Sequence, residues 1–186
     1  LGNLGIYYYY KADYISARDY HLKALKINEE LGNKNKTAKH LANIAIIYDI
    51  QGDSPNALDY FLKALRINEG LNNKEGIGAN LANIGIVYAK QEDYSKAIDY
   101  YFKALTINEE MGDERGIAII LGNIGLIYWH QGNYSKALDY YFKSLTMKEK
   151  LGDKNGIAAN LGNIGIIYDD QKEYTKALDY YFRALK

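Results

Sequence analysis

The sequence predicts an all-α protein, a solenoid of five helix-turn-helix repeats. The first observation is a Leu-Gly/Ala-Asn triplet that recurs every 40 residues without insertion, at Leu1–Asn3, Leu41–Asn43, Leu81–Asn83, Leu121–Asn123 and Leu161–Asn163. The second is that each period contains two stretches with apolar residues at helical spacing, separated by a polar break. A fixed period of about 20–50 residues is typical of repeat architectures, in which stacked neighbours share one core.

The third period illustrates the first helix of each repeat. Its apolar stripe falls at i, i+3, i+4 and i+7, on Leu81, Ile84, Gly85 and Tyr88. This spacing predicts a helix from about Lys74 to Lys90. Because Gly85 is small, it allows another helix to approach closely. Its counterparts in the other repeats are Gly5, Ala45, Gly125 and Gly165.

A second helix follows the polar break at 91–93. Its stripe comprises Tyr94, Ala97, Tyr101, Ala104 and Leu105. The spacing is again helical and predicts a helix from about 94 to 111. Tyr100, Tyr101 and Phe102 recur at equivalent positions of other repeats, and we expect all three to lie in the core.

The boundaries between repeats have the chemistry of helix caps. Gly, or Asn in one case, follows each second helix, at Gly32, Asn72, Gly112 and Gly152. These residues favour the left-handed conformation that ends a helix. The next residue is Asn or Asp, which caps the N-terminus of the following helix well. Pro55 falls in the first turn of a second helix, where its missing N–H costs little.

These residues resemble the tetratricopeptide repeat. Leu81-x-x-Ile84-Gly85-x-x-Tyr88, followed by Ala97-x-x-x-Tyr101, is similar to the W-x₂-L-G-x₂-Y…A-x₃-F pattern. Leu replaces the family's Trp, Glu109 stands where the closing Pro is expected, and the period exceeds the usual length of about 34. Such lengthened repeats resemble Leu-Gly-Asn-repeat spindle adaptors, kinesin light chains and the sensor regions of bacterial signalling proteins.

The resemblance implies a right-handed α-solenoid of ten helices, with the first helices lining its concave side. We expect residues 1–186 to form a single array. The expected repeats are 1–32, 33–72, 73–112, 113–152 and 153–186. Since the sequence begins at Leu1 in the middle of a repeat, we interpret it as a fragment of a longer protein.

Composition narrows the classes of function. Lys+Arg and Asp+Glu are both 23, so the net charge is zero. A nucleic-acid or anionic-membrane binder needs a clustered basic face, so we expect neither partner. The absence of Cys excludes disulfides and zinc–thiolate sites. No apolar run reaches membrane-spanning length, and the expected location is the cytoplasm.

No motif indicates catalysis, a cofactor or a metal site, and the sequence therefore predicts a non-enzymatic protein. His21, His40 and His130 are the only histidines, and no two share a predicted helix. His21 occupies the position of Tyr101, so we interpret it as a packing residue. The glycines around Asn123 lie within a helical stripe and lack the Lys-Ser/Thr of a phosphate-binding loop.

A repeated asparagine marks the most informative face of the first helices. Asn occupies one position in all five repeats, at Asn3, Asn43, Asn83, Asn123 and Asn163. Its neighbours on this face are Gly or Ala and an Ile or Leu, such as Ile86 and Leu126. An Asn amide can pair with a backbone C=O and N–H together, and small neighbours let that backbone approach. The pattern predicts a peptide-binding groove. In the alternative, each Asn bonds the neighbouring helix.

Specificity is expected where groove positions differ between repeats. The candidates are Lys39, Lys90, Trp129 and His130. Trp129 is the only Trp, a residue enriched in binding hot spots, although an exposed aromatic without a role is the alternative. The leading hypothesis is a peptide-binding scaffold within a signalling or adaptor protein. The rival hypothesis is a structural spacer, or a module that stacks end to end through the apolar face of its last helix. That face comprises Ala177, Tyr181, Ala184 and Leu185.

Overall fold

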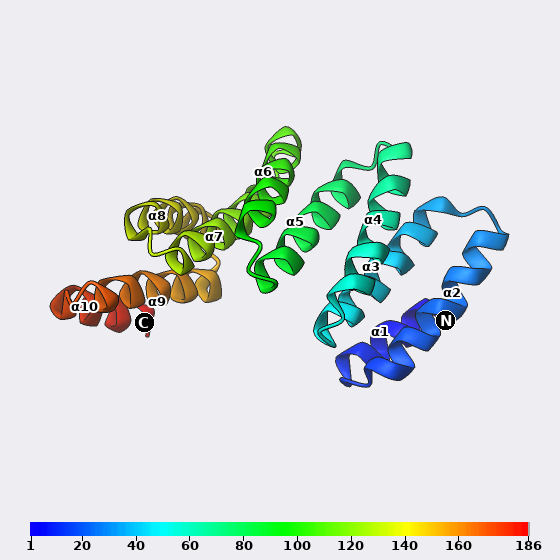
Figure 1. Ribbon diagram of the computed structural model, residues 1–186, viewed down its shortest axis with the longest axis horizontal. Helices are drawn as coiled ribbons and strands as arrows, with labels where there is room; N and C mark the ends of the chain where they lie inside the picture. Colours follow the sequence, from blue (N-terminus) through cyan, green and yellow to red (C-terminus); the bar gives the residue numbers. More distant parts are fainter. Residues whose placement is uncertain (186) are drawn as a thin grey trace. The chain divides into compact units, whose positions relative to one another are not determined.

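The computed structural model describes residues 1–185, which form ten α-helices and no strand. Figure 1 shows the helices following one another as antiparallel hairpins. The helices are α1 (Gly2–Tyr10), α2 (Tyr14–Glu30), α3 (Lys34–Ile50), α4 (Ser54–Gly70), α5 (Lys74–Lys90), α6 (Tyr94–Met111), α7 (Glu114–His130), α8 (Tyr134–Leu151), α9 (Lys154–Asp170) and α10 (Tyr174–Ala184). The all-α, repeated helix-turn-helix prediction is confirmed, including the bounds expected for α5 and α6.

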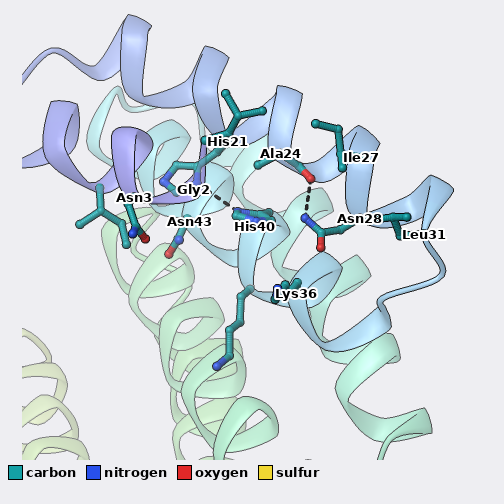
Figure 2. Close-up of a pocket in the computed structure, with 13 residues that line it drawn as sticks. Gly2, Asn3, His21, Ala24, Ile27, Asn28, Leu31, Lys36, His40 and Asn43 are labelled. Atoms are coloured by element: carbon teal, nitrogen blue, oxygen red, sulfur yellow. Dashed lines mark hydrogen bonds between the residues drawn. The ribbon is translucent and has the colours of Figure 1, made fainter.

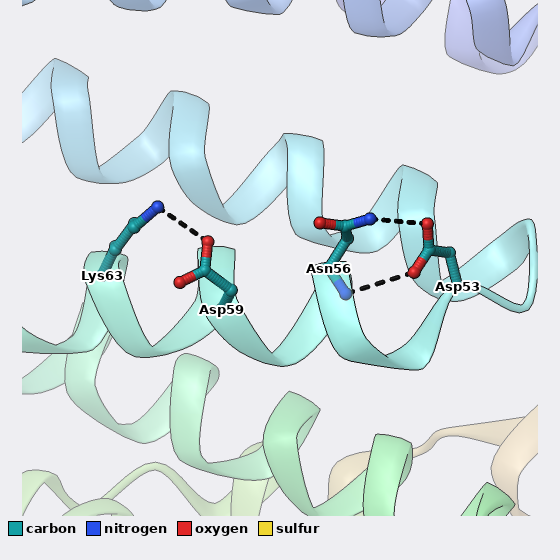
Figure 3. Close-up of polar contacts among 4 residues, drawn as sticks. All are labelled: Asp53, Asn56, Asp59 and Lys63. Atoms are coloured by element: carbon teal, nitrogen blue, oxygen red, sulfur yellow. Dashed lines mark hydrogen bonds and ion pairs between the residues drawn. The ribbon is translucent and has the colours of Figure 1, made fainter.

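Helix ends follow the predicted cap chemistry. One or two residues beyond the end of each of four second helices, a residue has positive φ, namely Gly32, Asn72, Gly112 and Gly152. The next side chain caps the following helix; for example, Asp113 accepts a hydrogen bond from the Gly116 backbone N–H at 3.0 Å. Asp53 caps α4 in the same way, ahead of Pro55 in the first turn, and also accepts from the Asn56 amide (Figure 3).

The turns within the repeats carry a feature that the sequence did not predict. Their central residue also adopts positive φ, but it is Gly in only two repeats, Gly52 and Gly132. The other turns place Ala12, Glu92 and Lys172 there, with φ between 57° and 61°. A side chain with a Cβ is strained in this region by about 1 kcal/mol or more.

Stacked tyrosines join the two helices of every repeat. Tyr88 and Tyr100 stack with ring centroids 5.5 Å apart and an interplanar angle of 19°. The same stack recurs as Tyr8–Tyr20, Tyr48–Tyr60, Tyr128–Tyr140 and Tyr168–Tyr180. Lysine ammonium groups lie over these rings, as Lys96 does over Tyr88 at 5.1 Å. Gly85 packs beside this contact, where an added Cβ would lie 2.6 Å from the Tyr101 ring.

The core consists of the inner faces of the hairpins. Four pairs of aliphatic residues on the first helices are at most 1% exposed, namely Ile44 and Ile47, Ile84 and Val87, Ile124 and Ile127, and Ile164 and Ile167. Tyr101 is buried as predicted, at 2% exposure. The prediction for Phe102 is wrong, because this side chain is 41% exposed. It follows Tyr101 by about 100° around the helix, which turns it away from α5.

The chain divides into two compact units, one of residues 1–107 and one that begins at Asn108. In the first unit each helix from α1 to α5 packs on the next, and α3 also contacts α5. In the second unit α7 to α10 pack in the same sequence, and α7 contacts α9. The first helices α3 and α5 are therefore in contact in the first unit, as α7 and α9 are in the second.

Candidate binding groove

A groove of about 380 Å³ runs between α3 and α5 in the first unit. Asn43 on α3 and Asn83 on α5 both line it. The small residues Ala42 and Ala79 lie beside them, and Lys39 stands exposed at its border. Two members of the repeated asparagine series thus lie in one groove, because equivalent positions of successive first helices face the same side.

The amides of Asn43 and Asn83 are half-buried and uncommitted. Among residues 1–185, no hydrogen bond of either side chain to another residue is formed. Each amide can donate through its NH₂ and accept through its oxygen. The pair can therefore bind the peptide groups of an extended chain laid between α3 and α5.

Two further asparagines, which the sequence analysis missed, form the floor of this groove. Asn68 and Asn80 line it and are 4% and 2% exposed. The Asn73 amide donates to Asn68 Oδ1 at 2.9 Å, and the Asn80 amide donates to the Gly76 carbonyl at 2.7 Å. A signal was present in the sequence, since Asn recurs at 28, 68 and 108 within otherwise apolar stripes.

The second unit carries the equivalent positions, each 80 residues later in the chain. Asn123 on α7 and Asn163 on α9 are half-buried, and their side chains form no hydrogen bond with the described residues. At the positions that Asn68 and Asn80 hold in the first unit, the second unit has Lys148 and Asn160. Lys148 Nζ donates to Asn160 Oδ1 at 3.0 Å. The floor residues of the two units therefore differ by one positive charge.

The variable positions near the ends of the first helices contact one another. Lys90 Nζ on α5 forms an ion pair of 2.8 Å with Asp49 Oδ2 on α3. Trp129 Nε1 on α7 donates to Asp170 Oδ2 on α9 at 2.6 Å. The ring of His130 lies 4.7 Å from that of Trp129. Three residues that we expected to meet a ligand, Lys90, Trp129 and His130, thus make contacts within the protein.

The remaining predicted residues lie on the same faces of the first helices. Asn3 on α1 is exposed, and Ile86 on α5 is half-buried. Leu126 on α7 is 40% exposed, a large fraction for an apolar side chain in a packed repeat. These positions leave apolar surface next to the uncommitted amides.

A second pocket, of about 500 Å³, lies among α1, α2 and α3 (Figure 2). Asn3 and Asn43 line it together with His21 and His40. It borders α1, which has nine residues where α3 has 17. The pocket is therefore bounded by a shorter first helix than the groove between α3 and α5.

The structure brings together two histidines that lie on different helices. His21 Nδ1 on α2 and His40 Nδ1 on α3 are 3.2 Å apart, so one neutral ring donates a hydrogen bond to the other. His21 is 2% exposed and lies against Gly5, so it occupies the position of a packing residue. Burial, reinforced by the charge of His40, lowers the pKa of His21 to about 4. Burial also lowers the pKa of His40, with further contributions from the N-terminal amine and Lys36.

Residues 1–185 contain neither a cluster of metal-ligating side chains nor a helix that could span a membrane. No group of three or more His, Cys, Asp or Glu side chains within this range is arranged to hold a metal ion. No helix in the same range has both the length and the apolar character needed to cross a membrane.

Solved structures similar to this chain are repeat proteins of low sequence identity. BtubC (BKLC) from P. vanneervenii is 20% identical, with a TM-score of 0.86, over 97% of this chain and 75% of that one. A Rap protein complexed with competence and sporulation factor is 20% identical, with a TM-score of 0.84, over 97% of this chain and 51% of that one.

A third structure is the Rap conjugation gene regulator of plasmid pLS20 in complex with the Phr* peptide. It is 20% identical, with a TM-score of 0.82, over 98% of this chain and 50% of that one. The present chain thus spans about half the length of the two Rap chains. No curated protein sequence matches it.

The tetratricopeptide repeat model matches the sequence in four overlapping segments, 1–70, 51–110, 77–150 and 116–186. Together these segments cover the whole chain. The matched segments contain the paired helices, the small residue at their closest approach and the capped boundaries described above. The chain belongs to the tetratricopeptide repeat family.

Proposed function

We propose that this chain is a non-enzymatic scaffold that binds an extended peptide along the first helices of its repeats. The observation that carries the proposal is the pair of uncommitted amides of Asn43 and Asn83, which line the same groove. A polar group left unpaired beside apolar surface favours a ligand that can satisfy it. A peptide backbone presents the donor and acceptor that each amide needs.

Helix spacing supports an extended ligand. Packed helices lie about 8–10 Å apart, and an extended chain rises about 3.3 Å per residue. Successive asparagines can then meet roughly every third residue of the peptide. Backbone contacts of this kind supply affinity, whereas the differing side chains along the groove select among sequences. Two similar structures are named for complexes with a peptide or factor, which is consistent with this mode.

The test uses random dodecapeptides displayed on phage, selected on the whole 186-residue chain. Selected peptides are synthesised, and their affinities are measured by fluorescence anisotropy. We expect Asn43→Ala with Asn83→Ala to weaken binding about tenfold or more, since each removes a hydrogen bond worth about 1 kcal/mol. Because neither amide has a hydrogen-bond partner among residues 1–185, the melting temperature should stay close to that of the parent.

The matched control is Asn155→Ala, an exposed asparagine on α9 outside the repeated series. It should bind like the parent chain. Equal affinity of the double variant and the parent would refute the role of the two amides. A selection that enriches no peptide at all would refute peptide binding itself.

A second candidate function is end-to-end self-association, favoured by the exposure of the two terminal helices. Leu4 and Tyr7 on α1 are 43% and 54% exposed, although equivalent residues of the later repeats are at most 1% exposed. On the face that we expected the last helix to expose, Leu185 is 83% exposed, but Ala177 is 2% exposed and Tyr181 packs against Gly165. The exposed apolar side chains of α10 are instead Leu178 and Phe182, at 55% and 63%. Sedimentation velocity over a range of concentrations tests this candidate, with Phe182→Asp as the disrupting variant. A monomer at high concentration would rule the candidate out.

A further inference from the structure

Lys148 is a buried cation of the second unit that forms no ion pair with the described residues, 1–185. Its side chain is only 9% exposed. None of the ion pairs among residues 1–185 includes it, and the hydrogen bond to Asn160 Oδ1 uses one of its three donors. Burying a charge is costly unless it is paired and hydrogen-bonded. The equivalent residues of the other repeats are the neutral Asn28, Asn68 and Asn108.

Two glycines show that Lys148 occupies the same place in its repeat as Asn68 does. A Cβ added at Gly76 would lie 2.5 Å from the Asn68 amide. A Cβ added at Gly156, 80 residues later, would lie 2.8 Å from Lys148 Cδ. Since Asn68 forms the floor of the α3–α5 groove, Lys148 is positioned at the floor between α7 and α9.

The ammonium group lies close to Gly122 of α7. The position of a Cβ at Gly122 is 3.9 Å from Lys148 Nζ, 3.7 Å from Asn160 Oδ1 and 3.5 Å from Ser144 Oγ. Ser144 Oγ already donates to the Ala118 carbonyl at 2.7 Å. Repeats two and three have Ala at the position of Gly122, so this repeat has a smaller residue in front of its charged floor.

The electrostatic environment of Lys148 is unfavourable to its charged form. Burial lowers the pKa of Lys148, and the carboxylate of Asp153 only partly opposes this effect. Asp153 is committed to the cap of α9, where it accepts from the Gly156 backbone N–H at 3.0 Å. A second carboxylate brought to the ammonium group would supply the missing anionic partner.

We propose that the neighbouring faces of α7 and α9, which carry Asn123 and Asn163, select peptides with an acidic side chain whose carboxylate binds Lys148 beside Gly122. This inference rests on the proposed peptide-binding function and specifies its ligand in one unit. The first unit has Asn68 and Asn80 at the same floor positions, so it imposes no such charge requirement. Asn68 thus offers a neutral contact in the first unit, and Lys148 offers a charged one in the second.

The experiment compares selections of random dodecapeptides by the parent chain and by Lys148→Asn, the residue found at the three equivalent positions. We expect the parent to enrich Asp or Glu at one peptide position and the variant to lose that enrichment. A selected peptide is then synthesised with Glu or Gln at that position. The parent should bind the Glu peptide on the order of tenfold more tightly than the Gln peptide, because hydrogen bonds to charged groups are stronger than those between neutral groups.

A second variant separates charge from packing. Lys148→Met keeps most of the apolar stem, and it should also lose the preference for Glu over Gln while binding the Gln peptide like the parent. Thermal melting shows whether each variant remains folded. Peptides selected without any acidic preference would overturn the inference and leave peptide binding standing. A parent chain that selects no peptide would overturn both.

Discussion

The indole Nε1 of Trp129 donates a hydrogen bond to Asp170 Oδ2 at 2.6 Å, and so links α7 to α9. In the first unit Lys90 and Asp49 make the corresponding link between α5 and α3. Both links join residues 41 positions apart, at the last turns of successive first helices. The side chains that vary most between repeats therefore bridge neighbouring first helices.

Replacing Asp170 with Asn should change the environment of Trp129 with little loss of stability. The pair is partly exposed, so we expect a destabilisation of about 1 kcal/mol or less. The emission of the only Trp should shift, because its N–H loses a charged acceptor. Fluorescence spectra and thermal melting check both effects. The control is Asp169→Asn on the adjacent exposed position, and an equal spectral shift there would contradict the assignment.

Adding a methyl group at Gly85 should destabilise the protein. The new Cβ would lie 2.6 Å from the Tyr101 ring, so the two helices of the repeat must separate or the ring must move. Overpacking of this kind costs about 1–3 kcal/mol. Urea denaturation of Gly85→Ala measures the change.

Gly162→Ala provides the matched control for that substitution. No atom lies within 4 Å of a Cβ at this helical position, so alanine should be neutral or stabilising by up to about 1 kcal/mol. A destabilisation at Gly162 as large as that at Gly85 would show that packing against the ring is not the cause.

Stability should fall when the pH drops from 6.5 towards 4. His21 has an ordinary pKa of 6.5 and a folded-state pKa of about 4, because burial and His40 disfavour its charged form. In this window the unfolded chain binds more protons than the folded one, so stability rises with pH. The contribution of His21 is on the order of 2 kcal/mol. Urea denaturation at several pH values measures it.

The repeats themselves provide the control for this pH dependence. His21→Tyr introduces the residue found at 101 and 141, and His40→Asn introduces the residue found at 80 and 160. The double variant removes the titrating pair while keeping groups accepted at these positions. It should lose most of the decline between pH 6.5 and 4. An undiminished decline would assign the effect to carboxylates elsewhere.

Relieving the backbone strain in the turn between α5 and α6 should stabilise the chain. Glu92 has a φ of 60°, a region where glycine occurs freely and where two other repeats place Gly52 and Gly132. We expect Glu92→Gly to stabilise by roughly 0.5 kcal/mol, because the relief of strain exceeds the entropy gained by the unfolded chain. Glu109→Gly, within α6, should instead destabilise by about 1 kcal/mol. Denaturation midpoints of the two variants should move in opposite directions.

The helices and their caps could be predicted from the sequence, because they depend on local interactions. The 40-residue period, the stripe of Leu81 and Ile84, and the Gly-Asp boundary at Gly112 depend on residues close together in the chain. Such features predicted the two helices of each repeat and their caps because φ preferences and capping hydrogen bonds act over a few residues. The exposure of Phe102 was mispredicted, since a recurring residue indicates a repeated environment and not necessarily a buried one.

The sequence by itself determined the family, the helices and the repeated position of the asparagines. Only the tertiary structure decided which residues meet across repeats, such as His21 with His40 or Trp129 with Asp170. It also placed Lys148 close to Gly122, although they lie on different helices. These contacts depend on the rotation and separation of packed helices, which are set by side chains distant in the chain and not by local periodicity.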